Sequence, residues 1–301
     1  RIRYEPTGTA RRSGGVGPNV PRRSLSFPAT GPLDSRRRDS AAARPIKKEP
    51  YVDEIELLID LHIEGERQGP GSARMTRRAL ELAGLEASKP LRLADLGCGT
   101  GASTLVLADA LDAHVTAVDF SEAFINELEA RARRAGLADS ITTVASTFED
   151  LALEEGAFDA LWSEGAIYNI GFERGIRDWR RYLKPLGVLA VSEITWLTDQ
   201  RPAELEAFWH EAYPEIDTAS RKFALLERHG YSPIGYLTLP SDCWTTHYYE
   251  PLKSRFGAFL ERHGHSEAAR ALVEGDRREI ELYDRYAGFF SYGFYIARRS
   301  D

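Results

Sequence analysis

Apolar and polar positions along the chain repeat with a spacing that switches between the helical and the extended period. From Ile55 to Leu61 the apolar side chains recur at the spacing of one helix face, and residues 73–85 repeat this pattern, with Ser72 as a candidate N-cap. Short apolar, β-branched runs then predict strands at 91–96, 114–120, 140–146, 158–165 and 188–196.

Helical patterns separate these predicted strands, at 102–111, at 121–137 with Ser121 as a candidate N-cap, and at 176–187, where a helix is followed by a turn. Strands that alternate with helices pair in parallel through right-handed crossovers, so we predict a doubly wound α/β domain. Its ligand site is expected at the carboxyl ends of the strands. The last third departs from this alternation: an inserted helical segment occupies 240–287, and an alternating aromatic strand closes the chain at 292–299.

The first 50 residues differ from the rest in composition. They hold 12 Lys and Arg against 4 Asp and Glu and show no period that could bury a face, so we expect a disordered basic extension. The same composition fits an organelle transit peptide, a nucleic-acid-binding arm or a dispensable tail. Since the whole chain carries −7, residues 51–301 are strongly acidic, which argues against a broad phosphate-binding surface.

Cysteine content and hydropathy narrow the class of protein. Two cysteines, Cys98 and Cys243, are too few for a disulfide framework or a four-thiolate zinc site, so we expect no metal. No apolar run approaches the roughly 20 residues that span a bilayer. The expectation is a cytoplasmic protein without a membrane partner.

The stretch "LADLGCGTGAST" at 93–104 is the main chemical signal in the sequence. Its three alternate glycines leave a bare backbone, which suits either a dinucleotide pyrophosphate or the methionine end of S-adenosylmethionine. Asp95 would repel a pyrophosphate but suits an ammonium or a sulfonium. Asp119 follows Gly97 by 22 positions, close to the roughly 20-residue offset of a ribose-binding acid. A nucleoside that carries an amino-acid cation fits both carboxylates.

"LADLGCGTGAST" followed by "VTAVDFS" resembles the first two motifs of class I S-adenosylmethionine-dependent methyltransferases. This resemblance implies a Rossmann-like seven-stranded sheet with an antiparallel last strand, over residues 51–301. It also implies that the glycine turn meets the methionine moiety and that the end of the second strand holds the ribose. The third strand ends in "ASTFED", without the acid that the family often has there, so the adenine contacts are expected nearby. The implied cofactor-binding residues in these motifs are Asp95, Gly97, Gly99, Gly101, Asp119, Phe120, Thr147 and Phe148.

A second resemblance is narrower and concerns "RQGPGS" at 67–72 and "WSEGAIYNIGFERG" at 162–175. Both are similar to segments of a bacterial methyltransferase subgroup that has no assigned substrate. The resemblance implies that Gln68 and Ser72 lie in a turn that closes over the cofactor. The helices of 51–90 and the segment 240–287 would then form a lid that selects the acceptor.

Candidate catalytic residues follow from the fourth strand and from the inserted segment. Glu164 could bind the cofactor's amine, accept a proton from the acceptor, or only cap the next turn. Tyr168 could cover the sulfonium with its ring or pack in the core. His247, within "CWTTHYY", could act as a base in an aromatic acceptor pocket, or the segment could be a lid packed on itself. Glu193, at the end of the fifth strand, could contact the acceptor or cap a turn.

We therefore expect transfer of a methyl group from S-adenosylmethionine to a small-molecule acceptor by in-line displacement. The fourth strand lacks the Asn/Asp-Pro-Pro-Tyr motif of enzymes that methylate nucleobase or amide nitrogens. A nucleic-acid-modifying methyltransferase that uses the basic arm remains the main alternative. A cofactor-binding protein without catalysis and an aminopropyl transferase are further alternatives.

Overall fold

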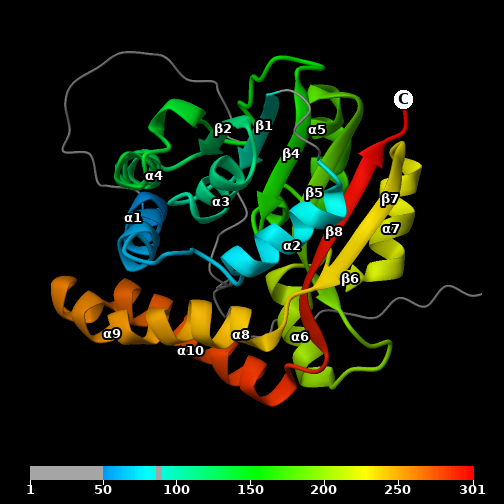
Figure 1. Cartoon of the computed structure of the whole chain (residues 1–301). Helices are drawn as coiled ribbons and strands as arrows, with labels where there is room; N and C mark the ends of the chain where they lie inside the picture. Colours follow the sequence, from blue (N-terminus) through cyan, green and yellow to red (C-terminus); the bar gives the residue numbers. More distant parts are fainter. Residues whose placement is uncertain (1–49, 86–89) are drawn as a thin grey trace, which may run out of the picture.

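The computed structural model describes residues 50–85 and 90–301 (Figure 1). The predicted N-terminal extension, residues 1–50, lies outside this part except for Pro50, which begins the first helix. In the described chain, no helix is long and apolar enough to cross a membrane. No cluster of three or more His, Cys, Asp or Glu in these same residues could hold a metal ion.

Seven strands form a sheet in the order β3-β2-β1-β4-β5-β8-β7, and a two-residue strand, β6, extends it beside β5. All neighbours pair in parallel except β8, which is antiparallel to both β5 and β7. The predicted doubly wound sheet with an antiparallel last strand is therefore confirmed. The strand bounds are β1 Leu91–Leu96, β2 Ala113–Asp119, β3 Ile141–Ala145, β4 Phe158–Glu164, β5 Leu183–Trp196, β6 Asp217–Thr218, β7 Tyr231–Thr238 and β8 Phe290–Arg299.

Ten α-helices and four short helical turns connect these strands within the described residues. The helices are α1 Pro50–His62, α2 Ala73–Ala83, α3 Ala102–Ala110, α4 Glu122–Ala135, α5 Phe172–Trp179, α6 Ala203–Ala212, α7 Ala219–Arg228, α8 Ser241–Trp244, α9 Glu250–Arg262 and α10 Glu267–Tyr286. The turns are η1 Ala138–Ser140, η2 Ile167–Asn169, η3 Arg180–Tyr182 and the π-helical η4 Thr245–Tyr249.

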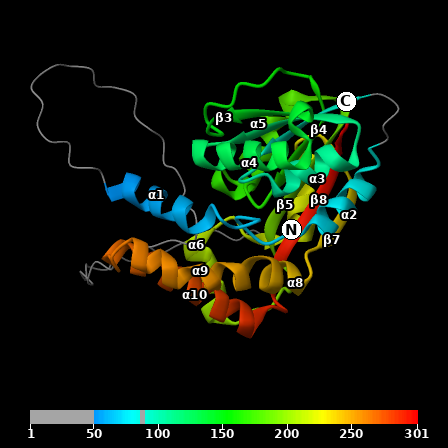
Figure 2. The same ribbon diagram turned by 60° about the vertical axis from the view of Figure 1, so that its left-hand side comes forward.

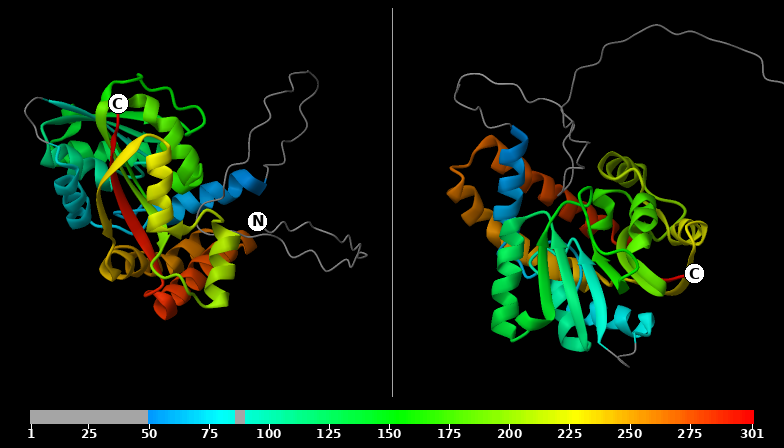
Figure 3. Two further views of the ribbon diagram at one scale, coloured as in Figure 1. Left: turned by 90° about the vertical axis from the view of Figure 1, so that its right-hand side faces the viewer. Right: turned by 90° about the horizontal axis from the view of Figure 1, so that it is seen from above.

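Alternation along the strands builds a separate core on each face of the sheet. In β1, Leu93 belongs to the core beneath α2 and α3, whereas Ala94 and Leu96 belong to the core on the α5 and α7 face. This division follows from the two-residue period of a strand that is buried on both sides. Figure 3 shows helices on both sides of the sheet, with α9 and α10 gathered at one end of it.

Caps and breaks fix most helix ends where the sequence predicts them. Ser72 accepts a hydrogen bond from the backbone of Met75, and Ser121 accepts one from Phe124, so both are N-caps. One prediction is shifted: the helix expected at 176–187 begins at Phe172 and ends at Trp179. This helix contains a glycine at position 175, where the side chain of Ile167 occupies the space that a Cβ would need.

The helices of the inserted segment lie across the carboxyl ends of the parallel strands. Figures 1 and 2 show α8, α9 and α10 along the lower end of the sheet, with α1 beside α9. Polar contacts fasten α1 to α9: Arg262 and His263 both bond to Asp60, and Arg255 donates to the carbonyl of Leu61. The fold thus closes the end of the sheet at which a ligand is expected.

Candidate functional site

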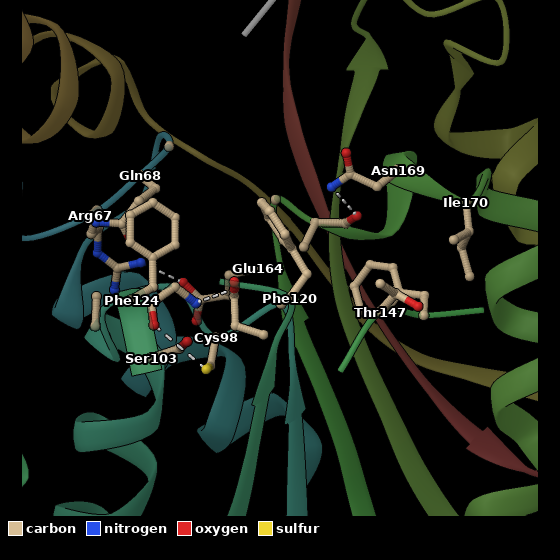
Figure 4. A pocket seen from close by; sticks show the side chains of 18 of the residues that line it. Arg67, Gln68, Cys98, Ser103, Phe120, Phe124, Thr147, Glu164, Asn169 and Ile170 are labelled. Atoms are coloured by element: carbon tan, nitrogen blue, oxygen red, sulfur yellow. Dashed lines mark hydrogen bonds and ion pairs between the residues drawn. The ribbon is translucent and has the colours of Figure 1, made fainter. Parts of the chain in front are cut away.

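A cavity opens at the carboxyl ends of β1, β2 and β4, directly over the glycine turn (Figure 4). Gly97, Cys98 and Gly99 form its floor, and Asp119, Phe120 and Glu164 stand around it. The segments 146–149 and 164–166 supply further walls, and Asn169 and Ile170 follow them. Ile55 and Leu58 of α1 cover it. We call it the glycine-turn cavity.

Two glycines in this floor are required by their surroundings. Gly97 and Gly99 adopt left-handed backbone angles, with φ of 75° and 53°. A Cβ on Gly97 would overlap the side chain of Ala166, and one on Gly99 would overlap the amide oxygen of Gln68. The chain therefore brings bare backbone to the cavity, as predicted. Gly101 does not line the cavity. It is the N-cap residue of α3, and a Cβ there would overlap the side chain of Leu128.

Asp119 joins the glycine turn to the end of β2. Its Oδ2 accepts a hydrogen bond of 2.9 Å from the Gly99 amide, and its Oδ1 accepts one of 3.0 Å from the Ser121 amide. Burial raises the pKa of Asp119, and these amide donors oppose the rise. Each carboxylate oxygen keeps one lone pair beyond these bonds. Because Asp119 also lines the cavity, it can accept hydrogen bonds from a ligand's hydroxyl groups.

Asp95 does not lie against the ligand site, where the sequence predicted it. It is fully buried beneath the turn and does not line the cavity, since its Oδ2 accepts hydrogen bonds from Ser103 and Thr104 in the first turn of α3. Burial raises its pKa to about 7, although both hydroxyl donors oppose the rise. The prediction that Asp95 faces a ligand cation is therefore corrected: the side chain fastens α3 to β1. The alternation of β1 explains this, because Asp95 shares the α3 face with Leu93.

Glu164, at the end of β4, lines the cavity but is already engaged by three donors. Arg67 Nη1 lies 2.7 Å from its Oε2, while Thr76 Oγ1 and Trp162 Nε1 donate to its Oε1 at 2.6 and 2.9 Å. The cation and the two further donors hold this carboxylate in one position. This arrangement favours a role in shaping the site over one in proton transfer.

The "RQGPGS" segment is fastened at three points around the cavity. Arg67 reaches Glu164, Ser72 caps α2, and Gln68 exchanges hydrogen bonds of 3.0 Å with Thr100 in the glycine turn. Gln68 lines the cavity, whereas Ser72 does not. The segment therefore lies against the glycine turn, and its closure over the cofactor stays a prediction. The importance of Arg67 was not predicted, although its position in the motif was a signal.

A second, smaller cavity adjoins the first. The two share Gln68, Gly69, Pro70 and Gly165 in their walls. Most of the remaining lining is aromatic, and one carboxylate, Glu279, stands among the rings. We call this cavity the aromatic chamber. Its other lining residues are Tyr168, Ile194, Trp209, Ala212, Tyr213, Trp244, Tyr248 and Tyr292.

The remaining predicted residues divide between the two cavities and the surface. Thr147 and Phe148 line the glycine-turn cavity near its exposed side, and Tyr168 lines the aromatic chamber. His247 is exposed on η4 and lines neither cavity, so it has no place from which to act as the predicted base. Glu193 pairs with the buried Lys222 at 2.9 Å, which gives it a structural partner instead of an acceptor.

Residues 93–187 match the protein family described as "Methyltransferase domain". The matched segment runs from β1 to β5 and includes the glycine turn. A crystal structure of a SAM-dependent methyltransferase from Geobacter sulfurreducens, in complex with S-adenosyl-L-homocysteine, superposes with a TM-score of 0.71. It is 19% identical and covers 80% of this chain and 97% of its own, which confirms the predicted fold.

Curated relatives match part of this chain. The chain is 29% identical over 197 residues to a trans-aconitate 2-methyltransferase of Escherichia coli O1:K1 / APEC, covering 64% of this chain and 71% of that protein. It is 36% identical over 130 residues to the ribosomal protein arginine N-methyltransferase rmt3 of Schizosaccharomyces pombe, covering 40% of this chain and 23% of that protein. For three curated relatives that it matches, the chain spans only 18–49% of their length.

Proposed function

We propose that this protein is an S-adenosylmethionine-dependent methyltransferase that acts on a small-molecule acceptor. The observation that carries the proposal is the pairing of the glycine-turn cavity with an adjoining aromatic chamber, both at the carboxyl ends of the parallel strands. The first cavity suits the cofactor, because its floor is bare backbone and Asp119 borders it. The second suits the acceptor.

The residues of the glycine-turn cavity have separable tasks in this proposal. When bound, S-adenosylmethionine supplies a methyl group on a positively charged sulfur. The amides and carbonyls around Gly97 and Gly99 bind its methionine end, and Asp119 accepts hydrogen bonds from the ribose. Thr147 and Phe148 border the adenine, while Ile55 and Leu58 of α1 exclude water. Alignment of donor and acceptor then supplies most of the catalysis, since a direct displacement needs no covalent intermediate.

A small acceptor is favoured by the enclosure of the aromatic chamber. Trp244, Tyr248 and Glu279 come from the segment 240–287, which thus covers the chamber at the carboxyl ends of the strands. This supports the proposal that the segment is a lid that selects the acceptor. Tyr168 belongs to the same chamber, so in this proposal it contacts the acceptor. Ser72 acts only by holding the "RQGPGS" segment.

Calorimetric titration with S-adenosylhomocysteine tests the cofactor assignment. We expect wild-type protein to bind it and Asp119→Ala to bind at least tenfold more weakly, with an unchanged circular dichroism spectrum. Asp139→Ala, a change at an exposed aspartate, is the matched control and should retain full affinity. Absence of binding to the wild type, or equal binding by all three proteins, would overturn the assignment.

A screen for release of S-adenosylhomocysteine tests the acceptor class. Wild-type protein is incubated with S-adenosylmethionine and, in separate arms, with a metabolite library, duplex DNA, transfer RNA and Arg-rich peptides. Turnover with a metabolite supports the proposal. Turnover confined to a nucleic-acid or peptide arm would overturn it in favour of a macromolecular substrate.

A further inference from the structure

The aromatic chamber combines ring faces with a carboxylate that no cation balances. Tyr168 and Tyr213 pack edge to face with centroids 6.0 Å apart, and Trp244 and Tyr292 do so at 5.2 Å. In each pair the edge of one ring meets the face of the other, and all four rings belong to the lining of the chamber. Because ring faces attract positive charge, this lining favours a cation over an anion.

Glu279 supplies the negative charge of the chamber. It is 7% exposed, lies on α10 and lines the chamber, and Tyr249 donates a 2.9 Å hydrogen bond to its Oε1. Among the described residues, no Lys, Arg or His forms an ion pair with Glu279. Burial raises the pKa of Glu279 to about 7, as expected for a carboxylate without a cationic partner.

Glu193 is a buried carboxylate of the same fold that does have a cationic partner. That side chain is also buried, but Lys222 Nζ lies 2.9 Å from it and neutralises it. Glu279 has no such cation beside it. Asp276, one turn earlier on α10, is a second buried carboxylate, and its Oδ2 has no hydrogen-bond partner in the described chain. Arg255 is the cation that acts on Asp276, but its guanidinium donates a hydrogen bond to the carbonyl of Leu61 and not to this carboxylate.

A buried carboxylate without a cation costs free energy unless a ligand repays it. The indole N–H of Trp209, which lines the same chamber and is 5% exposed, has no acceptor in the described part of the chain. Above about pH 7 the lining of the chamber therefore holds a negative charge, several aromatic rings and one N–H without an acceptor. A small ammonium ion that also carries an oxygen atom satisfies all three features.

We propose that the aromatic chamber binds the methyl acceptor as a small, positively charged organic amine, with its ammonium group against Glu279 and the surrounding rings. This inference rests on the proposed function for the meaning of the chamber as an acceptor site. The inference specifies the ammonium group that the chamber recognises, and it leaves open which atom of the acceptor receives the methyl group. Acidic metabolites and phosphate esters are disfavoured by the same charge, because they would meet Glu279 in a lining that contains no Lys, Arg or His.

The test compares amines with uncharged molecules of the same shape. Choline is paired with 3,3-dimethylbutan-1-ol and ethanolamine with propan-1-ol, and binding is measured at about pH 8 by calorimetry and by the fluorescence of the chamber tryptophans. We expect at least one amine to bind at least tenfold more tightly than its partner. In Glu279→Gln this preference should fall to less than threefold, whereas Glu274→Gln, on the exposed face of α10, should retain it.

The outcomes separate this inference from the proposed function. Equal or absent binding of amines and alcohols to the wild type, or a preference that survives in Glu279→Gln, overturns the amine assignment. The wild-type comparison stands even if Glu279→Gln does not fold. Binding of S-adenosylhomocysteine is measured on the same samples: its loss in the wild type overturns the proposed function, whatever the amines do.

Discussion

Nη1 of Arg67 lies 2.7 Å from Oε2 of Glu164, and both side chains are only 7% exposed. The two residues are far apart in the sequence, and their contact ties the segment before α2 to the end of β4. Both side chains also line the glycine-turn cavity. This buried pair therefore links the stability of the domain to the shape of its site.

Breaking this pair should destabilise the protein. Glu164→Gln leaves the Arg67 charge buried without its partner, so we expect the free energy of unfolding to fall by about 3 kcal/mol, measured by urea denaturation. Asp242→Asn, which breaks the exposed pair with Arg74, should cost less than about 1 kcal/mol. Equal losses in the two variants would contradict the structural role of the buried pair.

Gly99→Ala should weaken cofactor binding more than it weakens the fold. A Cβ there would overlap the amide oxygen of Gln68 and would stand on a left-handed backbone, so Gln68 or the turn that forms the cavity floor has to move. We expect at least a tenfold loss of affinity for S-adenosylhomocysteine in calorimetry. Gly136→Ala has a similar φ of 71° but open space around it, so this control should cost about 1 kcal/mol of stability and no affinity. Unchanged affinity in Gly99→Ala would refute the assignment of the floor.

Asp95 should make stability depend on pH. Its folded-state pKa of about 7 lies above the ordinary value of 3.8, so the folded protein retains a proton that the unfolded chain loses first. The stabilisation that protonated Asp95 contributes to the folded state is therefore fully present below about pH 4, and it is lost as the pH rises to about 7. Asp95→Asn mimics the protonated form and should exceed the wild type at pH 8 by on the order of 4 kcal/mol at most. Unfolding curves of the two proteins that stay parallel between pH 4 and pH 8 would rule this out.

The two cysteines should report on the cofactor cavity. Both are buried, and burial raises the pKa of each thiol, so alkylation of the native protein should be slow at neutral pH. Only Cys98 lines the glycine-turn cavity. We expect S-adenosylhomocysteine to slow alkylation of Cys98 at least tenfold and to leave Cys243 nearly unchanged, as measured by mass spectrometry. Equal protection of both thiols would indicate general stabilisation of the fold, not occupancy of this cavity.

The sequence predicted the fold well because its local signals agree with one another. The strand at 91–96, the caps Ser72 and Ser121 and the glycine turn each follow from short-range chemistry that the rest of the fold does not override. Prediction of the site was less complete. Whether Asp95 faces a cavity or a helix depends on the face to which one residue of β1 points, and a motif does not specify this.

Contacts between distant segments were the part that the sequence could not supply. Glu279 lies at helical spacing with Asp276, Ile280 and Tyr283, so carboxylates on an otherwise apolar face were a visible signal. Its meaning required knowledge of which rings surround it. His247 shows the converse, because the aromatic character of its neighbours suggested a pocket, whereas the backbone turns this side chain to the surface.

The wall that the two cavities share, from Gln68 to Pro70, has a consequence for affinity. Any displacement of this segment on loading of one cavity changes the space available in the other, which couples the two binding events. Thermodynamic linkage makes this coupling mutual: if the first ligand tightens binding of the second by some factor, the second tightens binding of the first by the same factor. The dissociation constant of each ligand then depends on whether the neighbouring cavity is filled.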